Sequence, residues 1–73
     1  MRYWFTIRGF VPEESAQKLW SRIKQYKANI TVLSDKVYVY GSANPDIIKL
    51  IENELMEVIK PFQNKVTLIN KVS

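Results

Sequence analysis

The sequence predicts a single α+β domain, residues 1–73, in which four strands and two helices follow one another as strand, helix, strand, strand, helix, strand. Three observations lead to this fold class. Short segments alternate apolar and polar residues with period two, two longer segments repeat apolar residues at helical spacing, and proline or glycine stands between them. Apolar residues make up 47% of the chain, which is typical of a packed globule rather than a disordered tail.

The first strand is expected over residues 2–8, which alternate and are rich in β-forming residues. Phe5 and Ile7 are predicted to face the core, and Trp4 and Thr6 to face away from it.

The first helix is predicted to follow a break at Gly9. Pro12 suits a helix start because proline is tolerated in the first turn, and the two glutamates after it are favoured at the positive end of the helix dipole. The apolar residues expected to form its buried face are Ala16, Leu19, Trp20 and Ile23.

A hairpin of two strands, residues 29–33 and 36–40, is expected around Ser34 and Asp35. A two-residue loop pairs Leu33 with Lys36, Val32 with Val37, Thr31 with Tyr38, Ile30 with Val39 and Asn29 with Tyr40. Ser-Asp is not the preferred pair for a type I′ turn, so a longer or irregular loop is the alternative. Directly opposed residues share a face of an antiparallel pair. The aliphatic pairs therefore face the core together, and Tyr38 and Tyr40 both face outward.

The second helix has a strong start signal in Asn44 and Pro45, an N-cap residue followed by proline at the first helical position. Pro61 is expected to end it. Its predicted buried residues are Ile48, Ile51, Leu55, Val58 and Ile59. The last strand is expected over residues 65–71, with Val66 and Leu68 inward and Lys65, Thr67, Ile69 and Lys71 outward.

Right-handed connections place both helices on one face of a four-stranded antiparallel sheet, and only one sheet face is apolar enough to receive them. This arrangement is the ferredoxin-like plait, with strand order 4-1-3-2. The other sheet face is left open, and it is the predicted functional surface.

Positive charge accompanies this open face. The net charge is +4, the first helix carries +2 and the second −2, so the whole excess lies in or beside the strands. Aromatic rings among cations are typical of a surface that binds single-stranded nucleic acid by stacking and phosphate contacts. The candidate binding residues are Arg2, Trp4, Thr6, Arg8, Lys36, Tyr38, Tyr40, Lys65 and Lys71.

Composition argues against several other functions. The chain has no cysteine and no histidine, so we expect no disulfide, no zinc, iron or copper site, and no cofactor. The carboxylate pairs Glu13/Glu14 and Glu54/Glu57 sit in helix patterns as solvated charges, so no catalytic residue and no enzyme activity are predicted. No apolar run is long enough for a membrane span and the first ten residues lack a signal-peptide pattern, so a cytoplasmic protein is expected.

The segment Lys36-Val37-Tyr38-Val39-Tyr40 resembles the third strand of the RNA-recognition motif family, in which a basic residue precedes two alternating aromatics. The segment from Phe5 to Pro12, followed by an acidic helix start, is similar to that family's first strand and loop. The resemblance implies base stacking at Tyr38 and Tyr40 and a basic contact at Lys36. This sequence departs from the family at Thr6, where an aromatic is expected, and in its shorter hairpin.

Two other interpretations stay open. The same open face suits a homodimer or a protein partner equally well, with Trp4, Leu33, Tyr40 and Ile69 at its centre, because an apolar patch rimmed by charge also marks protein contact. The element order and length also resemble the ACT family of small-molecule sensors, whose ligand site uses a glycine directly before the first helix. Here Gly9 is separated from that helix by three residues.

Overall fold

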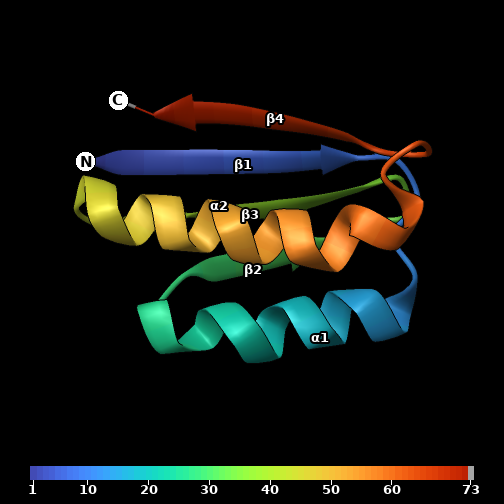
Figure 1. Ribbon diagram of the computed structural model, residues 1–73, viewed down its shortest axis with the longest axis horizontal. Helices are drawn as coiled ribbons and strands as arrows, with labels where there is room; N and C mark the ends of the chain where they lie inside the picture. Colours follow the sequence, from blue (N-terminus) through green and yellow to red (C-terminus); the bar gives the residue numbers. More distant parts are fainter. Residues whose placement is uncertain (73) are drawn as a thin grey trace.

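The computed structural model describes residues 1–72 and has the predicted element order (Figure 1). The strands are β1 (Arg2–Arg8), β2 (Asn29–Val32), β3 (Lys36–Ser42) and β4 (Thr67–Val72). The helices are α1 (Glu13–Ile23) and α2 (Pro45–Ile59), each followed by a single 3₁₀ turn, η1 (Lys24–Tyr26) and η2 (Lys60–Phe62).

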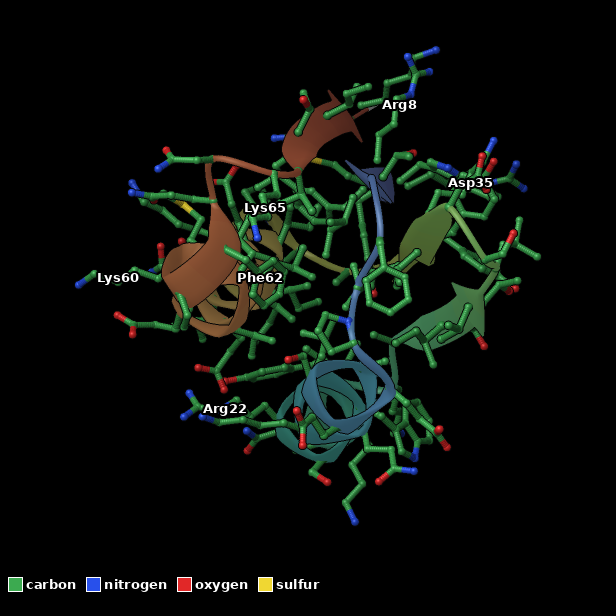
Figure 2. All side chains as sticks on the ribbon, turned by 90° about the vertical axis from the view of Figure 1, so that its right-hand side faces the viewer. Arg8, Arg22, Asp35, Lys60, Phe62 and Lys65 are labelled. Carbon is green, nitrogen blue, oxygen red and sulfur yellow. The ribbon has the colours of Figure 1, made fainter. Side chains whose placement is uncertain are left out.

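The sheet confirms the predicted topology. Its strand order is β2-β3-β1-β4 and every neighbouring pair is antiparallel. The hairpin has the predicted register, with Thr31 opposite Tyr38 and Ile30 opposite Val39. Both helices lie on one side of the sheet, and Figure 2 shows Arg8 and Asp35 on the opposite side. The ferredoxin-like βαββαβ fold is therefore present, and one sheet face is open.

The core lies between this sheet and the two helices. Its largest fully buried side chains come from two strands and both helices. They are Phe5 and Ile7 from β1, Val37 and Val39 from β3, Leu19 and Ile23 from α1, and Ile51 and Leu55 from α2. The period-two and helical patterns of the sequence predicted each of them. The ion pair between Arg22 and Glu54, 3.2 Å apart, also links α1 to α2.

The helix starts agree with their sequence signals. The Asn44 side chain accepts a hydrogen bond of 2.9 Å from the backbone N–H of Ile47, and Pro45 is the first helical residue. At α1, Pro12 occupies the N-cap position without a side-chain cap, and its carbonyl accepts from the backbone N–H groups of Ser15 and Ala16.

The last strand begins later than predicted, at Thr67 instead of Lys65. After η2 the chain continues in a turn, in which the backbone N–H of Lys65 donates to the carbonyl of Phe62 at 2.9 Å. The amide of Lys65 is therefore used by the turn and not by the sheet. β3 runs further than predicted, to Ser42, because Gly41 and Ser42 pair with the start of β1.

Two residues predicted to lie in the core are exposed instead. Trp20 on α1 is 44% exposed and Val32 on β2 is 51% exposed. Val32 has the predicted register and faces the helix side of the sheet. The prediction was wrong about burial because α1 does not close over the end of β2, and a groove remains between them.

None of the helices formed by residues 1–72 combines the length and the apolar composition needed to cross a membrane.

Candidate functional site

The open face of the sheet is organised in rows that run across the strands. One row consists of Asn29, Tyr40, Trp4 and Lys71, and the next of Thr31, Tyr38, Thr6 and Ile69. A third row contains Lys36, Arg8 and Thr67. At the opposite end of the face, next to the row of Trp4, Ser42 pairs with Arg2. The aromatic residues thus occupy the middle of the face, with cations on both sides along the direction of β1.

The three aromatic rings form one cluster around Trp4, which is 42% exposed. The Trp4 and Tyr40 rings are stacked, with centroids 4.6 Å apart and an interplanar angle of 20°. The Tyr38 ring lies 5.3 Å from Trp4 at a tilt of 53°. Because Trp4 and Tyr40 cover part of one another, the cluster presents a joint aromatic surface rather than three independent rings.

A hydrogen bond fixes one end of this cluster. The hydroxyl groups of Tyr40 and Thr31 are 3.2 Å apart, across the β2–β3 pair. Sequence reasoning placed Thr31 on this face through the hairpin register but did not predict its bond to Tyr40. The bond is diagonal, since Thr31 is directly opposite Tyr38.

Arg8 and Lys36 are directly opposite each other on β1 and β3. Like charges in this position destabilise a sheet unless something neutralises them. Asp35 reduces this repulsion only in part: its carboxylate is 4.0 Å from the Lys36 ammonium, but the Asp35 side chain is 72% exposed. This end of the open face is therefore suited to an anion.

A second pair of cations lies at the other end of the aromatic cluster. Lys71 on β4 is opposite Trp4, and Arg2 is two residues before Trp4 on β1. All three line one shallow hollow of about 540 Å³. The four strands contain no aspartate or glutamate, so the cations of this hollow and of the Arg8–Lys36 pair are the only ionisable charges on them.

Thr6 and Lys65 complete the predicted site residues, and only Thr6 lies on the open face. Thr6 is on the open face as predicted, half-buried between Tyr38 and Ile69. Lys65 is in the turn before β4, and Figure 2 shows it on the side of Phe62 and α2, away from Arg8. Lys65 was assigned to the face because strand alternation was extended through it, and the turn ends that alternation.

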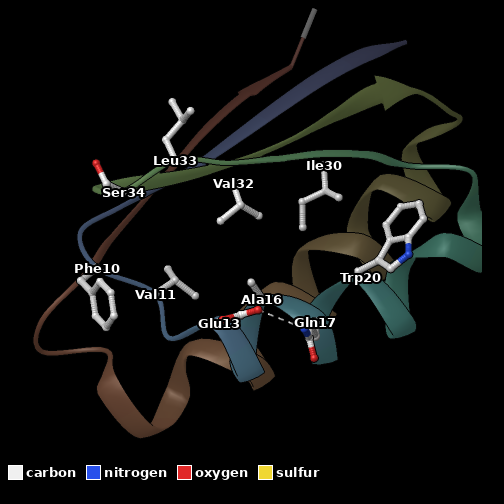
Figure 3. Close-up of a pocket in the computed structure, with 10 residues that line it drawn as sticks. All are labelled: Phe10, Val11, Glu13, Ala16, Gln17, Trp20, Ile30, Val32, Leu33 and Ser34. Atoms are coloured by element: carbon white, nitrogen blue, oxygen red, sulfur yellow. Dashed lines mark hydrogen bonds between the residues drawn. The ribbon is translucent and has the colours of Figure 1, made fainter.

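A second surface feature was missed by sequence reasoning. A groove of about 690 Å³ separates α1 from β2 (Figure 3). Ile30 and Val32 point into it from the strand, Trp20 approaches from the helix, and Phe10 closes one end. Its signal in the sequence is Phe10, an aromatic in the loop after β1 that neither strand nor helix periodicity assigns to the core.

Residues 1–72 contain no group of three or more carboxylate, histidine or cysteine side chains arranged to hold a metal ion. The Glu13 carboxylate accepts a hydrogen bond of 3.4 Å from the Gln17 side chain, and Glu54 pairs with Arg22. Comparison of the sequence with protein-family models and with curated proteins found no match.

Proposed function

We propose that the protein binds single-stranded nucleic acid on the open face of its sheet. The observation that carries the proposal is the order of groups along β1 and its neighbours: a cation pair, a central aromatic cluster, and a second cation pair. A strand of bases and phosphates offers the complementary pattern, since bases stack on aromatic rings and phosphates attract cations.

The size of the face fits a short stretch of nucleotides. Arg2 and Arg8 are six residues apart on one strand, which corresponds to about 20 Å. Between them, the outer surface of the Trp4–Tyr40 stack and the tilted Tyr38 ring offer two places for a base. Arg2, Arg8, Lys36 and Lys71 are the phosphate contacts. Lys65 is not part of this proposal, because it lies outside the face.

The aromatic contribution is tested by replacing Trp4 and Tyr38 with alanine, singly and together. Each lost stacking platform is expected to weaken affinity about tenfold, since stacking contributes roughly 1 to 3 kcal/mol per base. Binding is measured by fluorescence anisotropy with a labelled mixed-sequence oligonucleotide at low salt, as RNA and as DNA. Unchanged affinity in the double variant would contradict the proposal.

Trp20→Ala is the matched control for this experiment. Trp20 is as exposed as Trp4, at 44% against 42%, but it is on α1 and far from the sheet face. Its replacement should leave nucleic-acid affinity unchanged. The charge contribution is checked by the salt dependence: four phosphate contacts predict a slope of log K against log salt near about −3, and Lys71→Ala should reduce it by about 0.7.

A protein partner on the same face is the second candidate. The observation that favours it is apolar surface beside the cluster, from Leu33, which is 47% exposed, and from the half-buried Ile69. Nothing comparable favours a small-molecule site of the ACT type, because the N–H of Gly9 already donates to the carbonyl of Asp35 at 2.7 Å.

A further inference from the structure

The groove between α1 and β2 gathers several large exposed apolar side chains on the helix side of the sheet. Phe10 is 70% exposed, Val32 51% and Trp20 44%. All three line the same groove, with Ile30 between them on β2 (Figure 3). Contiguous apolar surface on a small domain marks a place where another surface docks.

The backbone of β2 is also unpaired on the side of this groove. The N–H of Leu33 donates to the carbonyl of Lys36 at 2.8 Å, so Leu33 and Lys36 are a hydrogen-bonded pair. Alternation along an antiparallel ladder then makes Thr31 bond to β3 and turns the N–H and C=O groups of Ile30 and Val32 toward the sheet edge. In the part of the chain that the structure describes, no strand pairs with β2 on that edge.

The same two residues therefore offer both kinds of contact. Ile30 and Val32 present backbone donors and acceptors at the edge and apolar side chains in the groove beneath it. β2 contains no proline and no charged residue, which are common means of blocking an exposed edge strand. An added strand would gain ladder hydrogen bonds and apolar burial together.

The hydrogen-bonding pattern of β2 identifies the occupant, because it is complementary to itself. In an antiparallel pairing of β2 with its own copy, centred on Thr31, Ile30 is opposite Val32 of the second copy. Both hydrogen-bonding residues at the edge therefore find a partner.

The helix beneath the edge has the same self-complementarity. The first turn of α1 is acidic, with Glu13 and Glu14, and the residue after the helix, Lys24, is basic. A two-fold axis that runs β2 antiparallel to its copy also runs α1 antiparallel to its copy. The acidic start of one helix is thereby directed toward the basic end of the other.

We propose that two copies of this chain associate through the edge of β2 and the groove beneath it, which joins the two four-stranded sheets into one. Trp20, Ile30 and Val32 of each copy close the groove of the other. The association is isologous, as expected of a two-fold dimer. It uses an edge and not a face, so the aromatic cluster around Trp4 remains accessible in both copies. The inference does not depend on the proposed nucleic-acid binding.

Sedimentation equilibrium of the full chain from about 1 μM to about 1 mM tests the association directly. The chain should dimerise within this range. Val32→Lys places a charge in the groove and should weaken dimerisation at least about tenfold. Met56→Lys is the matched control: Met56 is similarly exposed, at 53% against 51%, but it is on α2 and does not line the groove, and its variant should dimerise like the parent.

A charge exchange provides a second test that keeps the apolar residues of the groove. Lys24→Glu alone should weaken the dimer about tenfold, since the two-fold axis turns two attractive contacts between helix ends into two repulsive ones. Glu13→Lys alone should do the same, and the double variant should restore the parent's dissociation constant. Both side chains are exposed, so these changes leave the fold in place, which circular dichroism would verify.

Three outcomes would overturn the inference. The first is a chain that remains a monomer at every concentration, whether or not it binds an extended apolar peptide at the edge of β2. A dimer that Trp4→Ala dissociates and Val32→Lys does not would belong to the open sheet face. Finally, a double charge variant no tighter than the two single variants would remove the antiparallel pairing of β2 with its copy.

Discussion

Tyr3 is buried near the start of β1, on the same side of the strand as Phe5 and Ile7. It is 3% exposed, packs against Phe5 with ring centroids 5.8 Å apart, and its hydroxyl reaches the backbone of Gly41 on β3. A side chain at position 41 would place its Cβ 2.8 Å from that hydroxyl oxygen. Glycine is needed here because of this close approach.

Gly41→Ala is therefore expected to destabilise the protein by about 1 to 3 kcal/mol, the usual cost of overpacking a core. Tyr3→Phe in the same chain should recover part of that loss, because it removes the nearest atom while the ring carbon Cζ, at 3.2 Å, stays close. Urea unfolding of the parent, both single variants and the double variant measures the coupling. Strictly additive effects would show that the contact between position 41 and the Tyr3 hydroxyl does not cause the destabilisation.

Burial also raises the pKa of Tyr3 above its ordinary value of 10.0. Below pH 10 the hydroxyl is protonated in both folded and unfolded chains, so its contribution to stability is complete. Above pH 10 the unfolded chain releases the proton first, and stability falls until the pH passes the folded pKa. The parent should lose more stability between about pH 8 and about pH 11 than Tyr3→Phe does. Equal losses in the parent and in Tyr3→Phe would show that the Tyr3 hydroxyl is not the cause of this pH dependence.

At the scale of elements, the start of α2 is set by one side chain. The Asn44 side chain caps the N–H of Ile47, and Pro45 follows it without a donor to satisfy. The start of α1 has no such bond, because Pro12 occupies the cap position. A side-chain cap therefore stabilises the first turn of α2 but not that of α1.

Asn44→Ala should lower the free energy of unfolding by about 1 kcal/mol, the typical value of a side-chain N-cap. Asn53→Ala is the control, because Asn53 is exposed in the same helix and alanine favours the helix interior. That variant should be as stable as the parent or slightly more so. Thermal and urea unfolding give both values, and equal losses in the two variants would contradict the capping role.

Element boundaries show where local signals are sufficient. The hairpin register was predictable because the apolar alternation of the two strands leaves two residues between them and a shift of one residue would turn every side chain to the other face. The start of β4 was not predictable, because Val66 alternates like a strand residue while the chain before it still belongs to a turn. Lys65 was consequently placed on a face that it does not reach.

At the scale of the whole molecule, charge and apolar surface are separated in space. The open face combines cations with the aromatic cluster, and the groove below β2 is lined mainly by apolar side chains and, within residues 1–72, by no cation. The first surface suits a polyanion and the second suits a copy of the chain. The two proposals can therefore fail independently, since Trp4→Ala tests one and Val32→Lys the other.

The sequence by itself determined which side of each strand faces the core, the antiparallel pairing, and the placement of Trp4, Tyr38 and Tyr40 together, because these follow from alternation and hairpin parity. Tertiary structure decided the mutual stacking of Trp4 and Tyr40, the Thr31–Tyr40 bond, and the exposure of Trp20 and Val32. The physical reason is that periodicity fixes the direction of a side chain, whereas its burial depends on how closely another element approaches, and a groove separates α1 from β2.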